Sequence, residues 1–378
     1  MAASNDQPIV TWQENGAERS ARWRSESGLP PPRRVVVADD RMKADVAYRL
    51  ACEGTALLWR GDYENAKQLL NAIARRIDKP PRKPRPPAAP KEAFHLHRQA
   101  QAQRARTLSM LLLQFHEDHT LHLKRAPQAQ EALSEVYGPV PERYVISLRE
   151  LLGAIGAHEW RRKGMAVPAA GGRIHPHYGV FSPIRSEYVK LVAEAPLPPA
   201  QLAFDIGTGT GVLAAVLAKR GVARVIATEL DPRAAACARE NVERLGLADR
   251  VSVVEADLFP DGRAPLVLCN PPWVPARPSS RLESAVYDPE SRMLRGFLAG
   301  LRDHLEPGGE AWLVLSDFAE RLGLRSRDEL MGWIADAGLT VIGRNDAKPV
   351  HPRSADASDP LHAARSSEVT SLWRLSAA

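Results

Sequence analysis

The stretch that decides the fold is "LAFDIGTGTGVLAAVLAKRG", residues 202–221. It joins a short apolar run to a helical run through a turn in which Gly207, Gly209 and Gly211 alternate with threonines. Glycines allow such a turn to bend sharply and to approach a ligand closely. A strand, a glycine turn and a helix in this order predict the first unit of a parallel sheet with a nucleotide-type ligand at the strand's end.

The same alternation of short apolar runs and helical runs continues toward the C-terminus. After "LAFDIG", the further predicted strands are "VARVIATEL" (222–230), "RVSVVEADL" (250–258), "PLVLCNPP" (265–272), "EAWLVLSD" (310–317) and "GLTVIGR" (338–344). This alternation predicts an α/β domain over residues 173–378, with a doubly wound, mostly parallel sheet. A seventh strand, "EVTSLWRLS" (368–376), follows the sixth without a helix, and we expect the two to pair antiparallel.

The first 172 residues have a different composition and are expected to be mainly helical. Residues 1–34 are polar and are expected to form a flexible arm. Residues 35–78 carry apolar residues at helical spacing and predict a small helical unit. A Pro-rich basic linker is expected over 79–92, followed by a mainly helical region over 93–172.

Composition excludes several classes of protein. With 44% apolar and 25% charged residues, and no apolar run near the ~20 residues of a membrane span, we expect no membrane partner. Cys52, Cys237 and Cys269 are scattered and lack CxxC spacing, so neither a disulfide framework nor a zinc site is expected, and a reducing cytoplasm is the expected location. The histidines of "HEDHTLH" (116–122) lack the HExxH spacing, so no metal site is predicted.

Positive charge is concentrated in the first part of the chain. Residues 1–172 contain 27 Lys and Arg against 19 Asp and Glu, whereas residues 173–378 contain 24 against 26. This asymmetry favours an anionic partner, with RNA or a ribosome as the candidate, although a basic solvated surface explains it equally well. The sequence does not set the oligomeric state.

Three acidic residues stand at the ends of predicted strands. A carboxylate at Asp205, just before the glycines, would repel a pyrophosphate but suits the ammonium group of S-adenosylmethionine (SAM). The strict alternation of glycines also departs from the G-x-G-x-x-G of dinucleotide sites, which disfavours an NAD-linked oxidoreductase. Glu229 is placed for ribose hydroxyls and Asp257 for the adenine amine. The predicted cofactor-binding residues are Asp205, Gly207, Thr208, Gly209, Gly211, Glu229, Asp257 and Asn270.

The fourth predicted strand stops at "NPPW", residues 270–273, which we predict to be the catalytic residues. Pro271 and Pro272 cannot continue a strand, and a residue that precedes proline is held extended. The side-chain oxygen of Asn270 and the carbonyl of Pro271 would then accept hydrogen bonds from a planar amine. Trp273 would stack on the flat acceptor group, an interaction worth roughly 1–3 kcal/mol for a nucleic-acid base.

From about Tyr178 onward, the chain resembles a class I SAM-dependent methyltransferase with a Rossmann-like fold. The resemblance rests on "FDIGTGTG", "ATELD" and "NPPW", and it points to the small methyltransferase domain of the HemK/PrmC-like or RsmC/RlmG-like enzymes. "HYGVFSPIRSEYVKLV" (177–192) stands where HemK-like proteins have a segment that closes over SAM.

The resemblance implies N-methylation of a planar amino group. An exocyclic amine of a base in ribosomal or transfer RNA is the expected acceptor. The alternative is a glutamine side chain of a protein such as a release factor, as in HemK/PrmC-type enzymes. A further alternative is a non-catalytic nucleic-acid-binding protein with a vestigial methyltransferase fold.

A substitution at the fourth motif tests the assigned chemistry. We expect Asn270→Ala to abolish methyl transfer and to leave SAM binding nearly intact. The reason is that the side-chain oxygen is needed to bind the acceptor amine and not to fold the glycine turn. Transfer of labelled methyl groups and calorimetric titration with SAM measure the two properties separately. Unchanged turnover in this variant would contradict the assigned role.

Overall fold

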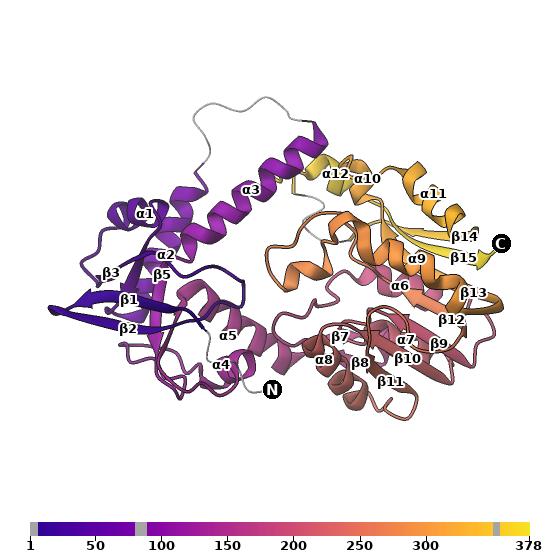
Figure 1. Ribbon diagram of the computed structural model, residues 1–378, viewed down its shortest axis with the longest axis horizontal. Helices are drawn as coiled ribbons and strands as arrows, with labels where there is room; N and C mark the ends of the chain where they lie inside the picture. Colours follow the sequence, from indigo (N-terminus) through magenta and orange to yellow (C-terminus); the bar gives the residue numbers. More distant parts are fainter. Residues whose placement is uncertain (1–6, 80–88, 351–355) are drawn as a thin grey trace. The chain divides into compact units, whose positions relative to one another are not determined.

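The computed structural model describes residues 7–79, 89–350 and 356–378 (Figure 1). These residues form two compact units, of which the C-terminal one comprises 160–378 with the short segment 89–95. Among the described residues, no helix is both long and apolar enough to cross a membrane.

The C-terminal unit is built on one seven-stranded sheet. Its strands are β9 (Leu202–Ile206), β10 (Arg224–Glu229), β11 (Val251–Glu255), β12 (Ala264–Cys269), β13 (Leu305–Ser316), β14 (Leu339–Ala347) and β15 (Thr370–Ala377). They lie in the order β11-β10-β9-β12-β13-β15-β14, and only β15 runs antiparallel to its neighbours. This confirms the predicted fold, including the antiparallel pairing of the last two strands.

Helices cover both faces of this sheet, as the continuous apolar character of its strands requires. They are α6 (Ser186–Glu194), α7 (Val212–Lys219), α8 (Pro232–Arg244), α9 (Arg292–His304), α10 (Phe318–Arg321), α11 (Arg327–Asp336) and α12 (His362–Ser366). Neighbouring residues of β9 show the two layers: Ala203 belongs to the core formed with α6 and α7, and Phe204 to the core formed with α9 and α11. A two-stranded sheet, β7 (Met165–Val167) with β8 (Gly172–Ile174), precedes α6.

The parallel strands end together at one edge of the sheet. Ile206 of β9 is in register with Thr228 of β10 and with Cys269 of β12. The chain adds β10 and β11 on one side of β9 and β12 and β13 on the other, so the order reverses between β9 and β12. Such a reversal leaves a crevice outside the carboxyl ends of the strands, where ligands of this architecture bind.

The N-terminal unit contains a six-stranded sheet in the order β1-β2-β6-β5-β4-β3. The strands are β1 (Ile9–Glu14), β2 (Ala17–Trp23), β3 (Arg34–Ala38), β4 (Thr55–Trp59), β5 (Leu111–Phe115) and β6 (Tyr144–Ser147). The helices along this part of the chain are α1 (Ala44–Cys52), α2 (Tyr63–Ile77), α3 (Pro90–Leu108), α4 (Gln130–Tyr137) and α5 (Leu148–Lys163). Helices are therefore present as expected, but the sheet was not predicted.

The expectation of a flexible arm over residues 1–34 is wrong in its described part, because β1 and β2 form a hairpin there. Asn15 and Gly16 connect the strands with φ angles of 54° and 75°. Asn-Gly with two positive φ angles is the preferred turn of a two-residue hairpin. Val10 and Trp12 are buried and their neighbours are exposed, a period of two that the polar composition of this stretch obscures.

The expected helical unit over 35–78 is in fact a β-α-β-α arrangement of β3, α1, β4 and α2. Every residue of β4 is buried, and a short, fully buried apolar run fits a strand and a helix equally well by periodicity. Asp62 does cap α2, since its side chain accepts a hydrogen bond from the backbone N–H of Glu64.

The expected boundaries also change. Most of the linker predicted over 79–92 lies outside the described residues, and α3 begins at Pro90. The region expected to be mainly helical over 93–172 includes β5 and β6, whose short apolar runs directly follow or precede helices. The C-terminal unit begins at Trp160 rather than at 173, because the β7–β8 hairpin packs with it.

The glycine turn generates a stability prediction. A Cβ added at Gly211, where φ is 80°, would lie 3.3 Å from backbone and side-chain atoms of Ala238 in α8. Gly246 has a similar φ of 66° but no atom within 4 Å of such a Cβ, so it is a matched control. We expect Gly246→Ala to cost about 1–2 kcal/mol of unfolding free energy and Gly211→Ala to cost more.

Urea denaturation of the full chain, followed by tryptophan fluorescence, measures this difference. Equal losses in the two variants would mean that backbone conformation alone, and not the approach of α8, requires glycine at position 211.

Candidate active site

The glycine turn between β9 and α7 is organised by the carboxylate of Asp205. This side chain is 1% exposed, and its Oδ2 atom accepts hydrogen bonds from Thr208 Oγ1 at 2.6 Å and from the backbone N–H of Ala214 at 3.0 Å. One carboxylate therefore fixes both the turn and the first turn of α7. The hydroxyl group of Thr208, a predicted cofactor residue, is committed to this internal bond.

Burial raises the pKa of Asp205 to about 6, although the hydrogen bonds from Thr208 and Ala214 favour the ionised form. The folded protein therefore holds a proton here between the ordinary pKa of 3.8 and about 6, and the free energy of unfolding falls as pH rises through that window. A bound cation would favour the carboxylate form.

The two other acidic strand ends lie where the sequence predicts. Glu229 ends β10, and its Oε2 accepts a hydrogen bond of 2.9 Å from the backbone N–H of Gly209, so it touches the glycine turn directly. Asp257 follows β11 with its side chain 48% exposed, and its Oδ2 is paired with Arg292 at the start of α9. The structure thus places Asp205, Glu229 and Asp257 in or just beyond the C-terminal ends of three adjacent strands.

The glycines of the turn differ in what surrounds them. A Cβ on Gly207 would lie 2.3 Å from the terminal methyl group of Met293, so this space is filled by α9. A Cβ on Gly209 would meet no atom within 4 Å, which leaves open space at this point of the turn. A ligand can therefore approach the backbone closely at Gly209, beside the carboxylate of Glu229.

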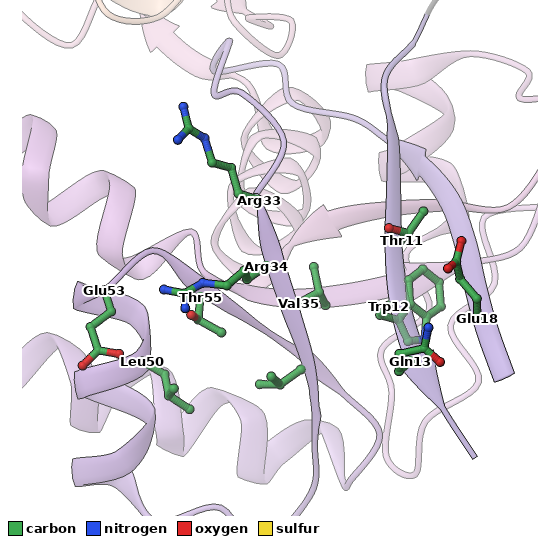
Figure 2. A pocket seen from close by; sticks show the side chains of 11 residues that line it. Thr11, Trp12, Gln13, Glu18, Arg33, Arg34, Val35, Leu50, Glu53 and Thr55 are labelled. Carbon is green, nitrogen blue, oxygen red and sulfur yellow. The ribbon is translucent and has the colours of Figure 1, made fainter. Parts of the chain in front are cut away.

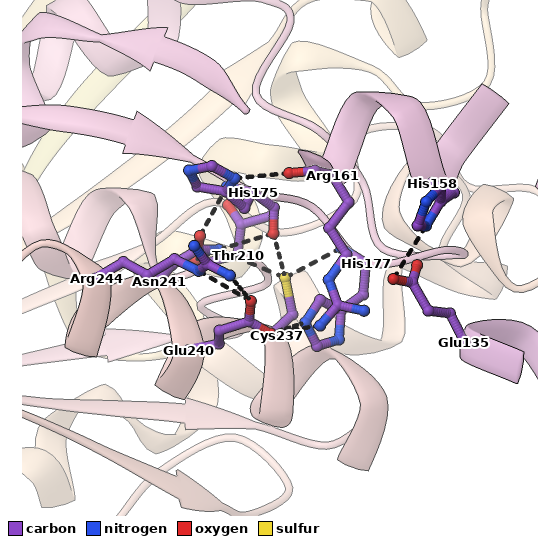
Figure 3. Close-up of polar contacts among 10 residues, drawn as sticks. All are labelled: Glu135, His158, Arg161, His175, His177, Thr210, Cys237, Glu240, Asn241 and Arg244. Atoms are coloured by element: carbon purple, nitrogen blue, oxygen red, sulfur yellow. Dashed lines mark hydrogen bonds and ion pairs between the residues drawn. The ribbon is translucent and has the colours of Figure 1, made fainter. Parts of the chain in front are cut away.

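A second layer of polar contacts holds the turn from α8 (Figure 3). The side chain of Asn241 is fully buried; its Nδ2 donates to the carbonyl of Thr210 at 3.0 Å, and its Oδ1 accepts from the backbone N–H of His175 at 2.7 Å. Nearby, Glu240 pairs with His177 and with Arg161, each at 2.7 Å. One amide thus joins the glycine turn to the segment that leads toward α6.

The Asn-Pro-Pro-Trp motif directly follows β12, beside the glycine turn. The indole Nε1–H of Trp273 donates to Asn270 Oδ1 at 2.9 Å, so a hydrogen bond joins the first and last residues of the motif. Pro271 is buried, whereas Trp273 is partly buried and packs against the cores of both sheet faces. The guanidinium of Arg185 lies 4.7 Å from the Trp273 ring centroid. The ring expected to stack on an acceptor therefore already has partners within the chain.

The sequence analysis did not identify several residues that border the site. Arg185 contacts Trp273 and is paired with Glu187 and Glu368, and the beginning of α9 supplies Arg292 and Met293. Nothing in the local pattern around these residues marks them, since their partners are far away in the sequence. Two of them, Arg185 and Glu187, lie in segment 177–192, which corresponds in position to the segment that closes over SAM in HemK-like proteins.

Elsewhere, the N-terminal unit has a hollow of about 440 Å³ between β1, β3 and the end of α1 (Figure 2). Both Arg34 and Glu53 line it, so the charge is mixed, and it contains none of the predicted site residues.

No group of three or more metal-binding side chains is found in the described part of the chain. His119 is buried and bonds Tyr144 at 2.7 Å, which is a structural role.

A parallel sheet whose acidic strand ends surround a glycine turn is the arrangement expected of a class I SAM-dependent methyltransferase. Residues 172–324 match the model of the family described as "Methyltransferase small domain". The chain belongs to this family. The membership confirms the predicted resemblance to the small methyltransferase domain.

Several relatives match part of the chain. The tRNA1(Val) (adenine(37)-N6)-methyltransferase of Shewanella amazonensis is 33% identical over 172 residues, which are 40% of this chain and 73% of the relative. The corresponding enzyme of Shewanella loihica is 31% identical over 144 residues, 35% of this chain and 59% of the relative. The release factor glutamine methyltransferase of Cereibacter sphaeroides is 39% identical over 173 residues, 42% of this chain and 59% of the relative. The chain thus spans about three fifths of the length of the last two proteins.

The raised pKa of Asp205 generates a pH prediction. We expect the affinity for SAM to fall as pH is lowered from about 7 to about 5, by up to about tenfold per pH unit below the pKa, because the ligand's ammonium must displace a proton. Calorimetric titration across this range measures the dependence. Asp205→Asn should bind weakly with little pH dependence, whereas Asp257→Asn should retain it. A constant wild-type affinity would exclude this role for Asp205.

Proposed function

We propose that the protein transfers a methyl group from SAM to a planar amino group, most specifically to the exocyclic amine of a base in transfer or ribosomal RNA. The observation that carries the proposal is the Asn270 carboxamide, held at the end of β12 beside the glycine turn. An amide oxygen at this position can accept a hydrogen bond from an N–H group of an incoming amine.

In this proposal, one set of residues binds the cofactor and another binds the acceptor. SAM supplies a methyl group activated by its sulfonium. Asp205, Glu229, Asp257 and the open space at Gly209 would hold it. Asn270 Oδ1 would accept a hydrogen bond from one N–H group of the substrate amine. This bond would orient the lone pair of the amine nitrogen. Since the two prolines restrict the backbone, little ordering of the motif is needed during the reaction.

Two observations support RNA as the acceptor. The relative of which this chain covers 73% is named for methylation of an adenine in tRNA. The first 172 residues carry the excess of positive charge that favours a polyanion. An exocyclic amine is reachable only in an unpaired or flipped base, so we propose a loop or single-stranded region as the substrate. Such substrates agree with the proposed cytoplasmic location.

A protein glutamine remains the alternative acceptor, and a specific observation favours it. The relative named as a release factor glutamine methyltransferase is 39% identical over 173 residues, a higher identity than in the two tRNA enzymes. A glutamine amide is planar and presents its N–H groups as a base amine does. The geometry of the Asn-Pro-Pro-Trp motif therefore suits both acceptors.

Labelled SAM distinguishes the two acceptors. Purified full-length protein is incubated with methyl-labelled SAM and with RNA, DNA, ribosomal protein and soluble protein from cells that lack the enzyme. We expect label that RNase releases, and an N-methylated base among the digested nucleosides. Asn270→Ala serves as the inactive control.

Label that only protease releases would replace the RNA proposal with the glutamine alternative. Label released by DNase would overturn both. If no fraction is labelled but the protein binds RNA in a salt-sensitive manner, the non-catalytic alternative is correct.

A further inference from the structure

Arg185 stands immediately before α6 and is a partly buried cation, with its side chain 22% exposed. Its guanidinium lies 4.7 Å from the centroid of the Trp273 ring. A guanidinium is planar and weakly hydrated, so it lies well against an aromatic face. Arg185 therefore supports the ring that closes the Asn-Pro-Pro-Trp motif.

Two buried carboxylates fix the position of Arg185. Its Nε donates to Glu187 Oε1 at 2.5 Å and its Nη1 to Glu368 Oε1 at 2.9 Å, and each glutamate is 4% exposed. Burial lowers the pKa of Arg185, but the two glutamates more than offset this, so the pKa is raised and the charge is kept. Removal of a charge from such a buried group leaves the others uncompensated.

Glu368 connects this group to the sheet. Its Oε1 also accepts a hydrogen bond from Ser316 Oγ at the end of β13, and Glu368 itself lies just before β15. The position of the guanidinium is therefore set by two strands and a helix, not by one flexible side chain.

The contact between Trp273 and Asn270 selects one orientation of the amide. An indole N–H is a donor only, so it must face the carboxamide oxygen and not the NH2 group. A carbonyl-type oxygen has two lone pairs, and one is left for another donor. With the amide reversed, two N–H groups would face each other, and the acceptor amine would meet a donor.

We propose that Arg185 is a positioning residue for methyl transfer, which acts through Trp273 to hold the Asn270 oxygen toward the acceptor amine. This inference rests on the proposed function of Asn270. It gives Trp273 a role in orienting the amide that is separate from stacking on the acceptor. It also assigns Glu187 and Glu368 to the support of the acceptor side of the site.

The first readout needs no acceptor. In the 15N-labelled full-length protein, hydrogen exchange of each tryptophan indole N–H is followed by NMR, and the Trp273 signal is identified by its loss in Trp273→Phe. We expect this N–H to be protected in the wild type. In Arg185→Lys, which keeps the charge but not the planar contact, we expect exchange to be faster by about tenfold or more.

A second Arg–Trp pair in the same unit supplies a matched control. Arg327 lies 4.9 Å from the ring centroid of Trp373 and is paired with Glu320 at 2.9 Å. Arg327→Lys should leave the exchange of the Trp273 indole unchanged. It therefore separates the proposed effect from a general loss of packing.

The second readout is turnover with the fraction that accepts label. We expect Arg185→Lys and Trp273→Phe each to lower kcat by about tenfold or more, with SAM affinity unchanged, since small displacements of a positioned group are costly. Their effects should not add in the double variant, because both act through the same amide. Arg327→Lys should keep wild-type kcat.

Each result decides the proposal. Unchanged indole exchange or unchanged kcat in Arg185→Lys would overturn it, as would additive effects in the double variant. If the wild type labels no fraction, the proposed function fails, and indole exchange alone decides whether Arg185 orders Trp273 and Asn270.

Discussion

One buried carboxylate sets the geometry of the glycine turn between β9 and α7. Asp205 lies near the end of β9, where its side chain is buried from water, so its charge must be satisfied by the chain. It binds the Thr208 hydroxyl and the first turn of α7, and these bonds require the backbone to reverse within a few residues. The reversal in turn brings the Gly209 N–H to Glu229 of the neighbouring strand. The glycines suit this constraint, because glycine adopts the positive φ angles of the turn without steric cost.

Charge is divided along the edge of the sheet. Carboxylates lie at the C-terminal ends of β9, β10 and β11, whereas the partly buried cation Arg185 contacts the aromatic ring that follows β12. In the proposed site a cationic cofactor would be attracted to the acidic strand ends, and the cation on the other side is already neutralised by Glu187 and Glu368. A sulfonium ligand over β9–β11 would therefore not be repelled from the adjoining strand. The proposed acceptor side would recognise its ligand by hydrogen bonding and shape.

The C-terminal unit could be predicted from sequence because its signals are local. Each strand is a short apolar run bounded by glycine, proline or an acid, and Asp205, Glu229 and Asn270 stand at strand ends that the pattern itself locates. The N-terminal sheet was missed because its strands are short and β4 has no period of two, although Asn15-Gly16 marked a hairpin. Arg185 could not be found in this way. Its partner Glu368 is 183 positions away, and only the folded sheet brings the two together.

The contact between Met293 and Gly207 makes the turn sensitive to oxidants. The thioether sulfur would lie 3.6 Å from a Cβ at position 207, and the terminal methyl even closer, so the side chain rests directly on the backbone of the turn. Oxidation to the sulfoxide would add a polar oxygen to the side chain that packs on this turn. Because Met293 belongs to the first turn of α9, a change in its packing would act on the glycine turn and on Arg292 together. Reduction of the sulfoxide restores the original fit, so damage at this single atom is reversible.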